Sequence, residues 1–383
     1  MQSNNLIRIS AAGAGKTYGI CNDALSIVQC SENDNKVLIV SYTNRGVEAI
    51  ETEIKKQNCG VLHPEVIVLS WYSFLLSEMI KPFQSFLFTI NEIRSFDFSA
   101  TYGTINYKRI GTRERYINKH GDIRSNEAAE LALQLNIKSG NLVIKRLETI
   151  YSNIFIDEIQ DMAGYDLDII EILMHSAISI VCVGDNKQAT FKTNNARKNK
   201  GKSGTNVWEF FAHLYNTGRV AIEQNQVSRR FNNEICAFAN SIYPNENNMT
   251  TSMRVITGHD GVFVICREDV AQYYAYFKPI VLRYNVKTKT DVIPAINFGA
   301  CKGLTFNRIL IYPNGPMSEW LFNDKALKSP QKYYVAVTRP KYSIAFVVDS
   351  LPEGEKYQNV IIELDDTSIA AKRVIMREGY KNA

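Results

Sequence analysis

Two short segments of the sequence contain residue types that can bind and hydrolyse a nucleotide. In the first, Gly13, Ala14, Gly15, Lys16 and Thr17 stand between an apolar run and a helical stretch. Glycines let backbone N–H groups approach phosphate oxygens, and the N-terminus of the following helix adds positive potential. The lysine can neutralise the β- and γ-phosphates, and the threonine hydroxyl can bind Mg²⁺. The segment predicts a binding loop for ATP or another NTP, with a purely structural turn as the alternative.

The second segment is an apolar run, residues 153–156, that ends in the carboxylates Asp157 and Glu158. Asp157 is suited to hold the Mg²⁺ shell together with Thr17, and Glu158 to orient or deprotonate a water. Two acids after a strand can also simply mark the start of a helix, whose dipole favours negative charge there. In combination with the glycine-rich loop, the pair predicts magnesium-dependent NTP hydrolysis.

Short β-branched runs alternate with helical stretches and would position both segments. Such runs occupy residues 6–9, 36–40, 66–69, 153–156 and 178–183, and the last third adds 261–266, 280–283, 308–312 and 344–348. This alternation is typical of α/β proteins with parallel sheets. We therefore expect two α/β cores.

Residues 75 to 150 interrupt this pattern. They combine aromatic and basic residues with turn signals, followed by an Ala- and Leu-rich helical stretch from 126 to 135. We expect an insertion, and divide the chain into a first core (1–75), the insertion (76–150), the rest of the first core (151–225) and a second core (226–383).

Several segments, read in order, resemble the motifs of superfamily 1A helicases of the UvrD/Rep/PcrA group. Beyond the loop at 13–17, they are 41–45 (SYTNR, motif Ia), 70–74 (SWYSF, Ib), 157–161 (DEIQD, II), 183–188 (VGDNKQ, III), 228–231 (SRRF, IV), 302–306 (KGLTF, V) and 334–339 (YVAVTR, VI). The resemblance spans residues 6 to about 348 and implies two RecA-like P-loop NTPase cores with a small 1B-like insertion. Within the group, the UvrD-like helicase subunit of the Gabija anti-phage system looks nearest.

The resemblance also implies roles for individual residues. Gln188 would sense the γ-phosphate, and Arg230 and Arg339 of the second core would complete the site, since arginine forks suit phosphate and stabilise developing charge. Arg229 and Gly303 would join the loop residues in holding the nucleotide. Positions matching those that face a single DNA strand are Tyr42, Thr43, Asn44, Trp71, Phe74 and Phe191. Aromatic residues after a strand are also typical of core packing, which stays open for Trp71 and Phe74.

Some positions depart from the family. Thr193 and Asn194 stand where the family has a DNA-stacking tryptophan and an arginine, and Arg229 replaces an aromatic residue that sandwiches adenine. We expect weak discrimination between ATP and GTP, and weak translocation. Only about 70 residues separate Arg230 from Lys302, too few for the 2B domain of large family members.

Two functions are compatible with these features. One is an NTP-dependent 3′→5′ DNA helicase or translocase that acts in anti-phage defence or DNA repair with a partner. The other is a DNA-sensing regulatory NTPase that gates a partner nuclease, of the OLD-family type if the Gabija resemblance holds, and unwinds little itself. Either would bind single-stranded DNA or duplex ends.

Composition limits the alternatives. The chain has 383 residues, of which 45% are hydrophobic and 22% charged, with a net charge of +5, as in globular proteins of more than one domain. No apolar run approaches the roughly 18 residues of a membrane span, and the N-terminus lacks a signal-peptide pattern, so we expect a cytoplasmic protein. Seven cysteines without a C-x-x-C pair and five scattered histidines predict no structural metal.

Overall fold

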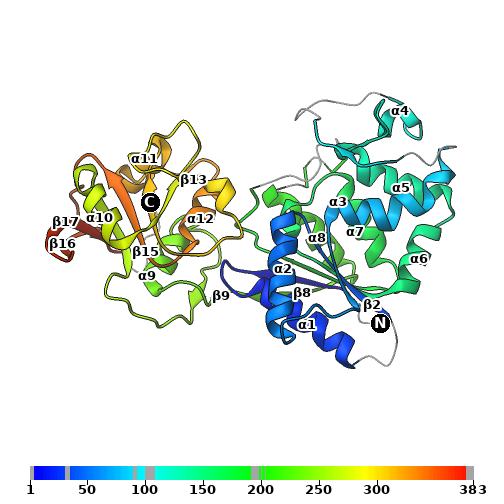
Figure 1. Cartoon of the computed structure of the whole chain (residues 1–383), viewed down its shortest axis with the longest axis horizontal. Coiled ribbons are helices and arrows are strands. Elements are labelled where there is room, and N and C mark those ends of the chain that lie inside the picture. The colour runs from blue at the N-terminus through cyan, green and yellow to red at the C-terminus, as the bar shows by residue number, and fades with distance from the viewer. Residues whose placement is uncertain are drawn as a thin grey trace. The chain divides into compact units, whose positions relative to one another are not determined.

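The computed structural model describes residues 4–30, 35–88, 93–99, 108–190, 198–199, 201–202 and 204–376. The chain forms two compact units (Figure 1). Unit 1 comprises Met1–Ser10 and Lys16–Gln224, and unit 2 comprises Ala11–Gly15 and Asn225–Ala383. The short loop after the first strand therefore groups with unit 2.

Unit 1 is built on a largely parallel sheet. Within its described residues the sheet has six strands, in the order β3 (Val66–Ser70), β2 (Lys36–Ser41), β6 (Tyr151–Ile156), β7 (Ser179–Gly184), β1 (Leu6–Ser10) and β8 (Ala221–Asn225). The first five run parallel to one another. Because β1 and β6 both pair with β7, the loops that follow these three strands leave the sheet at the same edge.

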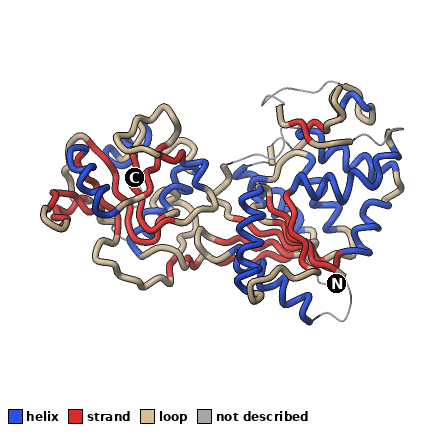
Figure 2. The backbone as a smooth tube through the Cα atoms, in the orientation of Figure 1, coloured by secondary structure: helices blue, strands red, loops and turns tan. Residues whose placement is uncertain are grey.

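Alternating side chains of the strands bury both faces of this sheet. On β2, Val37 and Ile39 pack against α1 (Lys16–Cys30) and α2 (Asn44–Gln57), while Leu38 and Val40 belong to the core of the opposite face. Such unbroken apolar runs are typical of parallel strands covered on both sides. Figure 2 shows these strands together, with helices around them.

The segment between β3 and β6 packs onto the second face of the same sheet. It contains α3 (Trp71–Phe74), a π-helical turn η1 (Leu75–Ile80), a 3₁₀ turn η2 (Lys81–Phe86), β4 (Phe96–Asp97), α4 (Arg113–Tyr116), β5 (Ile123–Arg124), η3 (Ser125–Glu127), α5 (Ala128–Lys138) and α6 (Leu142–Ile150). Its apolar residues share one core with the strands and with α7 (Tyr165–Met174) and α8 (Val207–Asn216). Glu130 is a buried carboxylate there, and Arg115 donates to it at 2.7 Å, which ties α4 to α5.

Unit 2 is built on a mixed sheet. Its described strands follow the order β13 (Ala295–Asn297), β12 (Ile280–Arg283), β14 (Phe306–Tyr312), β15 (Pro340–Val348), β11 (Gly261–Cys266), β17 (Ser368–Val374) and β16 (Tyr357–Glu363). The first five are parallel, and β17 and β16 continue the sheet antiparallel. The helices are α9 (Asn233–Asn240), α10 (Val270–Phe277), α11 (Gly315–Asn323) and α12 (Gln331–Val337), with short turns η6 (Arg267–Asp269) and η7 (Phe298–Cys301).

The predicted α/β class with two parallel-stranded P-loop NTPase cores is confirmed. The four strands expected in the last third are present, and the β16–β17 hairpin was not predicted. No helix in the described residues combines the length and apolar character needed to cross a bilayer.

Trp71 and Phe74 are core residues, which corrects their predicted place on a nucleic-acid surface. Both side chains are fully buried, with ring centroids 5.6 Å apart, and the Trp71 indole N–H donates to Asp166 Oδ1 at 2.8 Å. In the single turn of α3, positions 71 and 74 share the face toward the sheet. A base cannot stack on either ring in this conformation.

This buried hydrogen bond predicts a stability difference between two tryptophan replacements. Trp71→Phe removes the N–H that Asp166 accepts from, and breaking such a buried bond costs about 1–3 kcal/mol. Trp208→Phe is the control, because the buried Nε1 of Trp208 has no hydrogen-bond partner within the described structure. Urea unfolding should show Trp71→Phe to be the less stable variant, and equal stabilities would contradict the structural role of the bond.

Candidate nucleotide-binding site

The glycine-rich loop connects β1 to the first turn of α1. Gly13 and Gly15 have φ angles of +76° and +83°, which L-residues with a side chain rarely adopt. At Gly13 a Cβ would also lie 2.6 Å from the Ser228 hydroxyl oxygen. Within unit 2, the Gly13 carbonyl accepts a hydrogen bond from the Arg229 backbone N–H at 2.9 Å. A side chain is therefore sterically excluded at Gly13, and at Gly15 the positive φ makes it strained.

Lys16 and Thr17 open α1, where the helix dipole is positive. The Lys16 ammonium donates to the Ser10 carbonyl at 3.1 Å and lies 3.7 Å from Asp185 Oδ2. Its side chain is thus folded back over the loop and faces the end of β7. Thr17 is half-buried in the same turn.

Asp157 and Glu158 follow β6 directly. Asp157 is buried, and its backbone N–H donates to the Val40 carbonyl at 2.8 Å, which continues the ladder between β6 and β2. Glu158 has a left-handed backbone, with φ +57° and ψ 39°. Such a conformation is strained for a residue with a long side chain and occurs where the surroundings enforce it.

Gln160 links Glu158 to the end of β7. Its side chain is fully buried, its Nε2 donates to Glu158 Oε2, and its Oε1 accepts from the Asp185 backbone N–H at 3.1 Å. Gly184 leaves room for this amide, since a Cβ there would come within 2.5 Å of Gln160 Oε1. Sequence reasoning quoted this glutamine in the motif but gave it no role.

Asp185 is the centre of these contacts. Its carboxylate is buried; Oδ1 accepts from the Lys187 backbone N–H at 3.0 Å, and Oδ2 accepts from Gln188 Nε2 at 2.8 Å. With Lys16 close to the same Oδ2, one chain of polar contacts joins Lys16, Asp185, Gln188, Gln160 and Glu158. We call this set the polar network. It gathers residues from the loops after β1, β6 and β7 in unit 1.

Thr17 and Asp157 are the residues suited to hold Mg²⁺. Both offer oxygen ligands, which this cation prefers. Burial raises the pKa of the Cys21 thiol to about 12, and the charges of Glu53 and Asp157 act in the same direction. The oxygen donors of Thr17 and Asp157 are thus of the kind that suits the cation. The buried, protonated Cys21 thiol is no nucleophile.

The two predicted arginines lie close together in unit 2. Arg230 Nη1 donates to the Thr338 carbonyl at 2.9 Å, and Arg339 Nη2 donates to the Thr338 hydroxyl at 3.0 Å. Arg339 is buried, and its Nε and Nη1 also donate to the carbonyls of Val335 (2.8 Å) and Leu304 (3.4 Å). Gly303, with φ +82°, forms the turn beside Leu304. Arg339 thus ties this loop to the end of α12, and its predicted contact with phosphate stays a prediction.

The remaining predicted residues lie elsewhere. Tyr42 is half-buried and Thr43 and Asn44 are exposed at the start of α2, where Thr43 Oγ1 caps the helix by accepting from the Gly46 N–H at 3.0 Å. Arg229 is exposed and Ala14 is buried. Phe191, with Thr193 and Asn194, lies outside the described residues.

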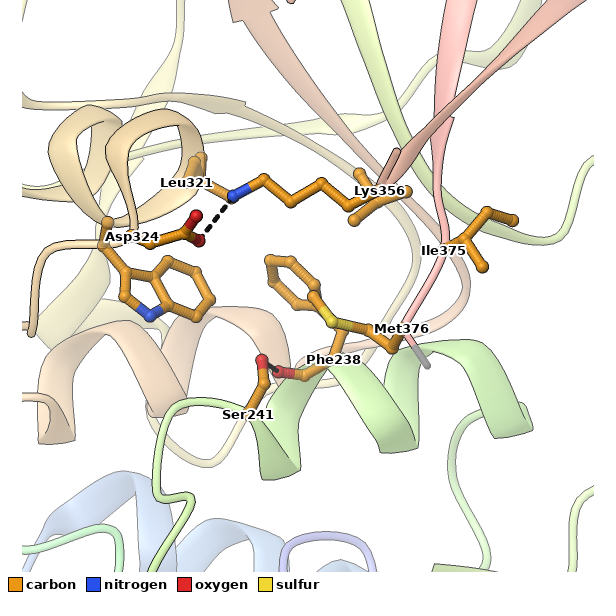
Figure 3. A pocket seen from close by; sticks show the side chains of 9 residues that line it. Phe238, Ser241, Leu321, Asp324, Lys356, Ile375 and Met376 are labelled. Atoms are coloured by element: carbon orange, nitrogen blue, oxygen red, sulfur yellow. Dashed lines mark hydrogen bonds and ion pairs between the residues drawn. The ribbon is translucent and has the colours of Figure 1, made fainter. Parts of the chain in front are cut away.

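A pocket in unit 2 does not contain any of these residues. It is bordered by α9, α11 and the end of β17 (Figure 3). Its lining is mainly apolar, and its Lys356 ammonium is paired with Asp324 at 2.6 Å. No polar network like that of unit 1 reaches it within the described residues, so we assign it no role in nucleotide binding.

The parallel sheet with a glycine-rich loop between β1 and α1 defines a P-loop NTPase fold. Residues 1–193 match the AAA domain family, and the chain belongs to this family. Among solved structures, the chain is similar to an Arterivirus nonstructural protein 10 (helicase) in complex with DNA, at 14% identity and a TM-score of 0.44. The match covers 90% of this chain and spans 60% of the length of that helicase. No curated protein matches the chain.

The polar network predicts that Gln160 positions the carboxylate of Glu158. Gln160→Met keeps the side-chain volume but removes both hydrogen bonds, so kcat for NTP hydrolysis should fall about tenfold or more, with little change in KM. Gln84→Met is a matched control, because Gln84 is also buried in unit 1 and, among the described residues, its amide donates only to a local carbonyl, that of Lys81. A Gln160→Met variant with the kcat of the wild type would refute the positioning role.

Proposed function

We propose that the chain is a nucleic-acid-dependent NTP hydrolase. The observation that carries the proposal is the polar network, which joins the lysine of the glycine-rich loop to a carboxylate after β6 and a glutamine after β7. In the proposed mechanism Lys16 leaves Asp185 for the β- and γ-phosphates, and Thr17 and Asp157 hold the cation, which neutralises phosphate charge when bound. Glu158 orients the attacking water and takes its proton.

The second unit supplies the proposed transition-state contacts. Arg230 and Arg339 are proposed to stabilise charge that develops on the γ-phosphate, as a fork of guanidinium donors can. In unit 2, Arg339 donates to Val335, Leu304 and Thr338, and Arg230 donates to the Thr338 carbonyl. Gln188, bound to Asp185, is proposed to respond to the γ-phosphate when Lys16 moves.

Paired substitutions test the hydrolytic roles. Lys16→Ala should abolish NTP binding, because the Lys16 ammonium that would neutralise the phosphates is gone. Glu158→Gln should still bind NTP, but its rate of hydrolysis should fall by a factor of about 10² or more. Isothermal titration and phosphate release measure the two effects separately. Lys55→Ala and Glu209→Gln, both exposed on helices outside the network, are the controls. Normal hydrolysis by Glu158→Gln would overturn the carboxylate assignment.

The nucleic acid is proposed to be DNA, and the activity a 3′→5′ helicase or translocase similar to the UvrD group, used in anti-phage defence or DNA repair with a partner. The exposed start of α2, with Thr43 and Asn44, supports a backbone contact there. Added oligo(dT) should stimulate hydrolysis, and displacement of a strand from a 3′-tailed duplex by the lone chain tests unwinding.

A specific observation favours the alternative, a DNA-sensing NTPase that gates a partner nuclease. Two aromatic residues expected to face DNA, Trp71 and Phe74, are core residues, and Thr193 replaces the family's stacking tryptophan. With fewer stacking contacts, the protein binds each base of single-stranded DNA more weakly while it translocates. DNA-stimulated hydrolysis without strand displacement would support this alternative, and efficient displacement by the lone chain would refute it.

Base selectivity should be low. Arg229 is exposed where the family has an aromatic residue, and a guanidinium plane can stack on either purine. We expect kcat/KM values for ATP and GTP to agree within about tenfold. Stacking on a guanidinium involves no hydrogen bond to the edge of the base, and such a bond is what would let the site distinguish adenine from guanine. Steady-state kinetics with both nucleotides measures this ratio, and a preference of several hundredfold would contradict it.

A further inference from the structure

The β16–β17 hairpin ends the sheet of unit 2 on one side and lies at the margin of that unit (red in Figure 1). β16 is the last strand in the order, so within the described residues one of its two edges has no strand paired to it. All seven of its residues pair with β17 without a shift in register. Such a regular edge presents a row of N–H and C=O groups with which another strand can pair.

Two hydrogen bonds show which backbone groups face this open edge. The Leu364 N–H donates to the Thr367 carbonyl and the Ile375 N–H to the Lys356 carbonyl, both at 2.8 Å. Hydrogen-bonded pairs alternate along an antiparallel ladder, so the even-numbered residues of β16 bond to β17 and the odd-numbered ones direct their N–H and C=O groups outward. In the outer part of the strand these odd-numbered residues are Asn359, Ile361 and Glu363.

The two faces of the hairpin differ in burial. On one face, Val360 and Ile362 pack into an apolar core of unit 2 together with Ile369 of β17. On the other face Ile361 is 69% exposed and is paired with Ala370, which is also exposed. One face therefore holds the hairpin in place, and the other leaves apolar side chains in solvent next to the open edge.

β16 lacks the features that usually protect an edge strand from association. Those features are charged residues, above all lysine, as well as proline, a bulge or a short length. From Tyr357 to Ile362 the strand has no charged residue and no proline, and its ladder with β17 has no bulge. The strand at the other end of the same sheet, β13, has only three residues and directly follows Pro294. Length and composition thus single out β16 as an edge suited to pairing.

The sequence of β16 is complementary to itself in one antiparallel register. A twofold axis at Ile361 sets this residue opposite Ile361 of a second copy, and Asn359 opposite Glu363. Two branched apolar side chains, or an amide and a carboxylate, form favourable cross-strand pairs. An axis at Glu363 would oppose two carboxylates. An axis at Asn359 would need the Tyr357 N–H, which already donates to the Gly354 carbonyl at 3.0 Å.

We propose that two copies of the chain associate through antiparallel pairing of β16 with β16, with the twofold axis at Ile361. The two seven-stranded sheets then form one continuous sheet, and the exposed Ile361 side chains cover each other. This inference goes beyond the proposed function, because the pairing requires neither nucleotide nor nucleic acid. An interface based on one strand is small, so the dimer should dissociate on dilution.

Analytical ultracentrifugation of the full chain over a range of concentrations tests the association. The unchanged chain should shift from monomer to dimer as its concentration rises. Ile361→Lys sets two like charges opposite each other and should raise the dissociation constant of the dimer by about tenfold or more. Ile137→Lys is the matched control, because Ile137 is an isoleucine of α5 in unit 1 with a similar exposure of 65%. A chain that stays monomeric, or equal dissociation constants for the two variants, would overturn the proposal.

A disulfide test determines the register and does not depend on the stability of the lysine variant. It uses a chain in which the exposed Cys30 and Cys59 are replaced by serine. Ile361→Cys should crosslink to its counterpart under mild oxidation, because Cα atoms of a hydrogen-bonded pair are about 5.5 Å apart, within the range that a disulfide spans. Asn359→Cys is the control, since the proposed register separates it from its counterpart by about 13 Å along the strand. Equal crosslinking of both variants, or of neither, would contradict the pairing.

Discussion

The buried carboxylate of Asp185 constrains the site of unit 1 more than any other group. A buried carboxylate that is not hydrated needs hydrogen-bond or ion-pair partners, because leaving it unpaired would cost several kcal/mol of folding free energy. Here the partners are a backbone N–H, the Gln188 amide and, at 3.7 Å, the Lys16 ammonium. The first two belong to the loop after β7 that carries Asp185 itself, whereas Lys16 follows the loop after β1. The pairing of β1 with β7 is therefore what brings the lysine to this carboxylate.

That strand order also explains which parts of the site could be predicted from the sequence. A glycine-rich loop after one apolar run and two acids after another are local patterns, and each lies at the end of a strand as expected. Gln160 and Asp185 are different, because their importance comes from a contact between residues 25 positions apart. The only local signal for it was Gly184, whose missing side chain makes room for the amide.

The aromatic residues after β3 show a second limit of prediction from the sequence. Trp71, Tyr72 and Phe74 lie within four positions, and the sequence alone does not tell which of them faces the sheet. The bond from Trp71 to Asp166 settles this, since Asp166 lies on a helix that follows β6. Likewise, nothing in the pattern of residues 75–150 indicated that this segment shares its core with the sheet. Phe96 of β4 packs against this core, and its ring, like that of the following Phe98, lies next to Tyr72.

The residue type at position 160 follows from its two hydrogen-bond partners, the Glu158 carboxylate and the Asp185 backbone N–H. Glu158 presents carboxylate oxygens, so it needs a donor, whereas the backbone N–H of Asp185 needs an acceptor. A single side chain can meet both needs only if it carries a donor and an acceptor a fixed distance apart, as a carboxamide does. Glutamate would set two carboxylates against each other, and lysine would leave the N–H without an acceptor. The amide thus joins Glu158, the proposed base, to the loop that holds Gln188, and it adds no charge between them.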